Sequence, residues 1–90
     1  MYAKRVTLAN ATGLHVRPAT LFMETASRFL SSVRVRRHES AADGKSAISL
    51  MLLEAAHGAD LTIEAEGDDE IAAVETLVDL VERGFGESSN

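Results

Sequence analysis

The residues best suited to chemistry in this 90-residue chain lie in one stretch, residues 13–20. It contains a histidine, His15, an arginine two positions later, Arg17, and a proline, Pro18. Pro18 would lie in the first turn of a predicted helix, where the missing N–H costs nothing. Such a helix would direct its free N–H groups and the positive end of its dipole toward His15. The spacing therefore predicts an anion-binding position that contains a histidine.

A histidine at this position could act on a phosphoryl group. The helix start disfavours a positively charged ring, so we expect His15 to be neutral and nucleophilic near pH 7. The backbone N–H groups of Val16 and Arg17, together with the Arg17 guanidinium, could hold the phosphoryl group after attack. Gly13 would let the backbone turn tightly and leave His15 accessible. From spacing alone, His15 as a polar residue beside the cap and Arg17 as a solvated charge remain equally possible.

The elements that would position these residues follow from hydrophobic periodicity. Alternating apolar and polar residues predict strands over residues 2–8, 32–37, 38–42 and 61–66. Helical spacing predicts helices over residues 16–29 and 46–53, and from Asp68 or Asp69, as N-cap, to Gly84 at the C′ position. The last helix should bury one apolar face, formed by Ile71, Val74, Leu77, Val78 and Val81.

The element order is βαββαβα, which predicts the fold class. Every strand has one apolar face, so three helices should cover one side of a four-stranded, mostly antiparallel sheet. This is an α+β, open-faced sandwich. We expect a single domain over residues 1–90, with residues 87–90 as a flexible tail.

Composition and charge exclude several classes of function. The chain is 46% hydrophobic and 26% charged and has no cysteine, so neither a disulfide scaffold nor a cysteine-ligated metal is possible. The net charge of −5 combines a basic first half, +5 over residues 1–45, with an acidic second half, −10 over residues 46–90. This balance disfavours nucleic-acid binding. With no cysteine and no apolar stretch long enough for a membrane span, we expect a cytoplasmic protein. We also expect it to be a monomer.

No cofactor or metal is expected. The three histidines, His15, His38 and His57, lie on separate predicted elements without the i,i+4 spacing of a metal pair.

Three motifs resemble the HPr family, the histidine-containing phosphocarriers of the bacterial phosphotransferase system. The first is residues 13–20, with the histidine at the family's distance from the N-terminus. The second is Asp43-Gly44-Lys45-Ser46 followed by a short apolar helix, and the third is the turn over residues 65–70. The likeness covers essentially the whole chain, and βαββαβα is also the family's order. Val16 departs from the Ala or Thr that is usual in the family.

The resemblance implies a role for each motif. His15 would take a phosphoryl group on its δ nitrogen from phosphorylated enzyme I, which phosphoenolpyruvate charges, and pass it to an enzyme IIA domain. Arg17 would steady the phosphate, and Pro18 would hold the helix start. The protein would be a stoichiometric relay rather than a turnover enzyme. The alternatives are a carrier of the nitrogen-related branch and a binding regulator that depends on Ser46 phosphorylation.

The resemblance also implies a regulatory site and a docking surface. Ser46 would be phosphorylated by an HPr serine kinase in some bacteria, although it also suits a plain N-cap. The helix after it is apolar on more than one face, and Ile48, Met51 and Leu52 are expected to form an exposed patch that docks partners. The alternative is that all three are core residues.

Overall fold

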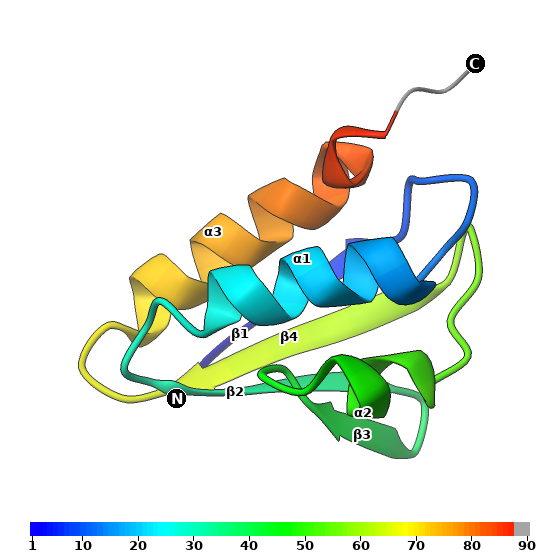
Figure 1. The fold of residues 1–90 in the computed structure, drawn as a ribbon. Helices are drawn as coiled ribbons and strands as arrows, with labels where there is room; N and C mark the ends of the chain where they lie inside the picture. Colours follow the sequence, from blue (N-terminus) through cyan, green and yellow to red (C-terminus); the bar gives the residue numbers. More distant parts are fainter. Residues whose placement is uncertain (88–90) are drawn as a thin grey trace.

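The computed structural model describes residues 1–87 as four strands and three α-helices, followed by one short 3₁₀ turn. Their order is the predicted βαββαβα (Figure 1). The elements are β1 (Tyr2–Thr7), α1 (Val16–Ala26), β2 (Ser32–Arg37), β3 (Ser40–Asp43), α2 (Ala47–Met51), β4 (Asp60–Glu66), α3 (Glu70–Glu82) and η1 (Gly84–Gly86).

The four strands form one sheet in the order β1-β4-β2-β3, and every neighbouring pair is antiparallel. β4 lies between β1 and β2 and pairs Val6 with Leu61 on one side and Val35 with Ile63 on the other. The three helices lie on one face of this sheet, and the other face is open (Figure 1). The predicted open-faced α+β sandwich is confirmed.

The core lies between the sheet and the helices. β2 and β4 alternate buried and exposed residues, as their period of two predicts. α1 and α3 each contribute one apolar stripe. The largest fully buried side chains include Phe22, Leu8, Leu50, Leu61, Ile63 and Leu77.

Several predicted boundaries were wrong. α1 ends at Ala26 instead of residue 29, because the chain tightens there into a turn in which Phe29 N–H donates to the Ala26 carbonyl over 3.1 Å. The edge strand begins at Ser40 instead of His38, which has a φ of +56° in the turn that joins β2 to β3. α2 is shorter than predicted, with Ser46 as its N-cap.

The face predicted for α3 was wrong at Ile71 and did not include Ala73. Ile71 is 59% exposed, and the buried stripe is Ala73, Val74, Leu77, Val78 and Val81. The first turn of α3 lies at one end of the sheet (Figure 1), and it buries Ala73 instead of Ile71. Its C-terminus is as predicted, because Gly84 follows the C-cap Arg83 with a φ of +64°.

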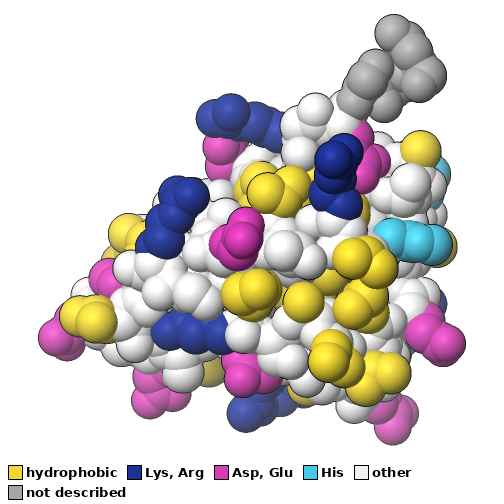
Figure 2. Space-filling model, viewed as in Figure 1, with side chains coloured by type: hydrophobic (Ala, Val, Ile, Leu, Met, Phe, Trp, Pro, Cys, Tyr) yellow, Lys and Arg dark blue, Asp and Glu magenta, His cyan; other side chains and the backbone are white. Residues whose placement is uncertain are grey.

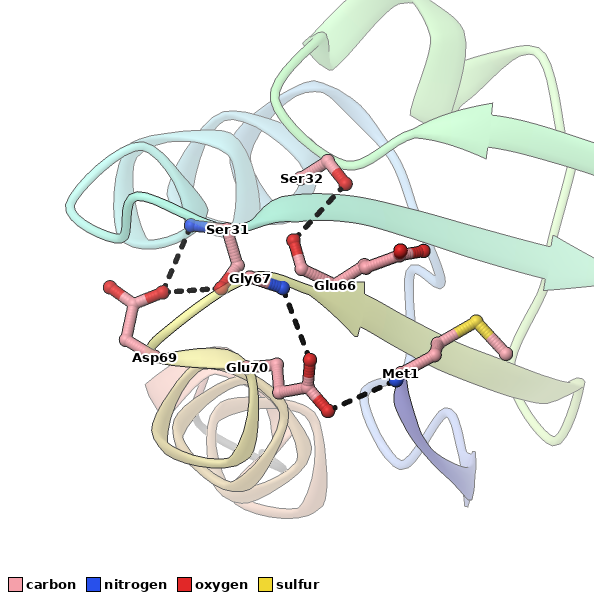
Figure 3. A network of polar contacts seen from close by, with 7 residues as sticks. All are labelled: Met1, Ser31, Ser32, Glu66, Gly67, Asp69 and Glu70. Atoms are coloured by element: carbon pink, nitrogen blue, oxygen red, sulfur yellow. Dashed lines mark hydrogen bonds and ion pairs between the residues drawn. The ribbon is translucent and has the colours of Figure 1, made fainter.

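Asp69 has a role that the sequence did not predict (Figure 3). It is the N-cap residue of α3, but its carboxylate does not cap the helix. It accepts hydrogen bonds from the N–H groups of Leu30 (2.8 Å) and Ser31 (2.9 Å) and from the Ser31 hydroxyl. These bonds, that of the Ser31 hydroxyl first, lower the pKa of Asp69. The carboxylate thus joins the α1–β2 turn to the start of α3.

Within residues 1–87, no helix has the length and apolar character needed to cross a bilayer. Of the tail predicted over residues 87–90, only Glu87 is among the described residues, so the prediction for 88–90 lies outside them.

Candidate functional site

His15 is the N-cap residue of α1, and its side chain is exposed. Its backbone is extended, with φ −79° and ψ −171°, as is usual for an N-cap. Its carbonyl accepts a hydrogen bond from Ala19 N–H over 2.9 Å, which closes the first helical turn. Its ring makes no capping hydrogen bond to the helix. The imidazole is therefore available to an incoming group.

The first turn of α1 presents two free amides beside His15. Val16 and Arg17 are the first two helical residues, whose N–H groups have no acceptor within a helix. Pro18, the third, has no N–H and is buried. The first turn contains no acidic residue. Arg17 is exposed, and none of the ion pairs within residues 1–87 uses its guanidinium.

Gly13 allows the loop before His15 to pass directly over the α2–β4 connection. Its φ is +69°, and a Cβ at this position would lie 2.4 Å from the Ala55 carbonyl oxygen. The next residue, Leu14, donates its N–H to the same carbonyl over 3.0 Å. Only glycine fits this approach, which sets the path of the chain into His15.

Asn10 and His57 both stabilise the loop before His15, a role that the sequence did not predict for either residue. The buried Asn10 donates from Nδ2 to the Gly13 carbonyl over 2.8 Å and to the Thr12 hydroxyl over 3.0 Å. Its own carbonyl lies 3.1 Å from Nδ1 of His57. A turn residue such as Asn10 is visible in the sequence, but no local pattern indicates a partner 47 residues away.

An open hollow of about 340 Å³ lies beside His15. It is lined by Leu14, His15, Val16, Met51, Glu54, Ala55 and Ala56. Ile48 and Leu52 are 70% and 76% exposed, while Met51 is half-buried. Val16, on α1, is 65% exposed. Figure 2 shows apolar side chains gathered over α2 and the start of α1. Of the three predicted patch residues, two are therefore exposed and the third lines the hollow with His15.

Ser46 is the N-cap of α2. Its hydroxyl oxygen accepts a hydrogen bond from Ser49 N–H over 3.2 Å, and the residue is half-buried. Its own N–H donates to the Asp43 carbonyl over 3.1 Å. The structure thus shows the capping contact for this residue.

The arrangement has groups that could receive an anion. His15 offers a ring nitrogen, the free amides of Val16 and Arg17 lie in the first turn of the same helix, and the exposed Arg17 carries a positive charge two residues from His15. A developing negative charge would be stabilised at such a helix start. Among residues 1–87, no three His, Asp or Glu side chains are grouped so as to hold a metal ion.

Comparison with known proteins identifies relatives along the whole chain. The phosphocarrier protein HPr of Neisseria meningitidis is 40% identical over 97% of this chain and 98% of its own length. The phosphocarrier protein NPr of Proteus mirabilis is 36% identical over 93% of this chain and 94% of its own. The crystal structure of HPr from Thermoanaerobacter tengcongensis superposes with a TM-score of 0.94 at 42% identity, covering 98% of this chain and 99% of that one.

These relatives, the open-faced sandwich and the free histidine at a helix start define a class, the phosphocarrier proteins of the phosphotransferase system. Within it, this chain belongs to the HPr family, whose model, "PTS HPr component phosphorylation site", matches residues 2–83.

Proposed function

We propose that this protein accepts a phosphoryl group on Nδ1 of His15 from phosphorylated enzyme I and passes it to an enzyme IIA-type domain. The observation that carries the proposal is the exposed His15 ring, which makes no capping hydrogen bond although it lies at the start of α1. A side chain used only for capping would accept from the helix N–H groups. An acceptor must instead keep its nitrogen free.

The transfer exchanges one phosphorus–nitrogen bond for another. The Nδ1 lone pair of His15 attacks the phosphorus of the donor phosphohistidine, whose own phosphorus–nitrogen bond breaks and returns the electron pair to the donor ring. Each ring keeps the hydrogen on its other nitrogen, so the donor leaves as a neutral imidazole and no proton moves in this step. The N–H groups of Val16 and Arg17 and the Arg17 guanidinium stabilise the transferred group. Because the reaction then runs in the same way to the acceptor, the protein is a relay rather than a turnover enzyme.

In this proposal enzyme I and the enzyme IIA-type domain bind the same surface of the carrier, one after the other. The carrier is a cytoplasmic monomer. Met51 lines the hollow beside His15, and Ile48 and Leu52 are exposed in and directly after the same short helix, so these apolar side chains suit transient docking. Relatives with both HPr and NPr names leave two branches open, sugar uptake and the nitrogen-related system. Rates of transfer from the host's enzyme I of each branch would assign the carrier to one of them.

The test is intact-mass spectrometry at neutral or mildly basic pH with phosphoenolpyruvate and the host's own enzyme I. We expect one acid-labile phosphoryl group on the wild type and on His38→Ala, and none on His15→Ala. His38 is a matched control because it is also exposed but lies in the β2–β3 turn. No phosphoryl transfer to the wild type from its cognate enzyme I would contradict the proposal.

A second role, as a binding regulator, would depend on Ser46 phosphorylation by a serine kinase. A phosphate at this position would add about two negative charges beside the docking residues. His15→Ala separates the two roles. A carrier with this substitution loses function, whereas a regulator phosphorylated on Ser46 keeps its complex.

A further inference from the structure

Glu54 follows α2 in a conformation that L residues avoid. Its φ is +53°, in the left-handed region that favours glycine. Its N–H donates to the Met51 carbonyl over 3.0 Å, so the turn is closed by the backbone and does not need the glutamate side chain. A non-glycine residue in this region is a reason to ask what its side chain does.

Glu54 lies near His15, the proposed phosphoryl acceptor. Leu14 N–H bonds to the Ala55 carbonyl over 3.0 Å, and His15 and Glu54 are the chain neighbours of these two residues. His15 and Glu54 also line the same hollow of about 340 Å³. Glu54 is exposed, and within residues 1–87 no hydrogen bond or ion pair uses its carboxylate.

We propose, building on the carrier function proposed above, that Glu54 is a specificity-determining residue that selects phosphoryl donors with a lysine or arginine opposite the hollow. A donor histidine can reach His15 only if the donor protein covers this hollow and displaces its water. A carboxylate that loses water without gaining a partner opposes docking. With a cation opposite, it instead favours docking and fixes the orientation of the donor.

In this proposal Arg17 and Glu54 interact with different groups of the donor. Arg17 binds the phosphoryl group, whereas Glu54 meets the cation of the donor protein. Arg17 is positive and Glu54 is negative. A donor docked in the wrong orientation would therefore place its cation against Arg17 or its phosphoryl group against Glu54. Glu54 also rejects donors whose surface is acidic at this point.

The test measures kcat/KM for transfer from the host's phosphorylated enzyme I at low and high ionic strength. Glu54→Gln removes the charge and keeps the size of the side chain. We expect it to lower kcat/KM about 5- to 30-fold at low ionic strength, with the difference shrinking at high salt, as for a lost ion pair. Glu82→Gln, an exposed carboxylate on α3, is the matched control and should change kcat/KM less than about twofold.

A third variant separates specificity from stability. Glu54→Gly removes the strain together with the charge, so we expect a higher melting temperature and a kcat/KM as low as that of Glu54→Gln. If Glu54→Gln transfers as fast as the wild type, or faster, this inference is overturned while phosphorylation of wild-type His15 keeps the carrier function. If wild-type His15 accepts no phosphoryl group, the carrier function fails first and this inference fails with it.

Discussion

His15 is the N-cap residue of α1, but its side chain does not cap the helix. Its backbone starts α1, while its ring makes no bond to the helix. The N–H groups of Val16 and Arg17 remain free for another acceptor. The helix therefore lacks a side-chain capping interaction, typically worth about 1 kcal/mol, but its first two N–H groups are available to an anion.

Substitution of Gly13 tests how closely the loop before His15 approaches the Ala55 carbonyl. Gly13→Ala and Gly58→Ala both place an L residue at a positive φ, +69° and +86°, but only the first meets other atoms, at 2.4 Å from the Ala55 carbonyl oxygen. We expect Gly58→Ala to lose about 1–2 kcal/mol of unfolding free energy from backbone strain alone. Gly13→Ala should lose about 1–3 kcal/mol more from the clash. Urea unfolding of both variants measures the difference, and equal losses would mean that the loop moves away freely.

The elements are held in place by contacts between distant segments of the chain. β4 pairs on both sides, and α2, with five residues, is too short to be stable by itself. The turn before α3 illustrates the same principle, because the Asp69 carboxylate bonds a segment 38 residues earlier in the chain. Such a bond also makes the stability of the turn depend on protonation.

Asp69→Asn tests this dependence. Hydrogen bonds from Ser31 and Leu30 lower the pKa of Asp69 below its ordinary 3.8. A carboxyl group with a lowered pKa stabilises the folded state above its ordinary value, and this contribution is lost as the pH falls through the lowered one. We expect Asp69→Asn to unfold more readily than the wild type at pH 7, with the gap closing as the pH falls below 3.8. Unfolding curves across pH measure this.

The control is Asp68→Asn, the exposed neighbour, which should show no such pH-dependent gap. A constant difference between Asp69→Asn and the wild type at every pH would mean that the lost carboxylate charge is not the cause.

Across the whole molecule, exposed apolar side chains occur at both ends of the helical layer, but His15 lies at only one of them. Figure 2 shows apolar side chains gathered over α2 and the start of α1, where the exposed Ile48, Leu52 and Val16 occur in the sequence. Leu30, in the α1–β2 turn, is 87% exposed at the other end. Exposed side chains contribute little to folding, so an apolar patch beside a reactive group is more readily explained by docking than by stability.

The double variant Ile48→Ser/Leu52→Ser tests the patch, with Leu30→Ser as the matched control. We expect each set of changes to shift the unfolding free energy by no more than about 0.5 kcal/mol per residue. Transfer from enzyme I to the double variant should fall about tenfold or more, since docking side chains near the centre of an interface each contribute above about 1 kcal/mol. Equal transfer rates for the double variant and Leu30→Ser would exclude the patch from docking.

The element order, the α+β class and the helix start at which His15 and Arg17 lie could all be predicted from the sequence. These depend on periodicity, turn residues and caps, which act over a few neighbours in the chain. The stripe of α3 was predicted except that Ile71 is exposed and Ala73 is buried, because periodicity does not say which edge of an apolar helix face the sheet covers.

The contacts between distant residues became visible only in the folded chain. It placed the Ala55 carbonyl over Gly13, the Asp69 carboxylate on Ser31, and Glu54 in the hollow beside His15. None of these pairings has a local signal, because each depends on how the packed helices and the sheet order bring separate segments together.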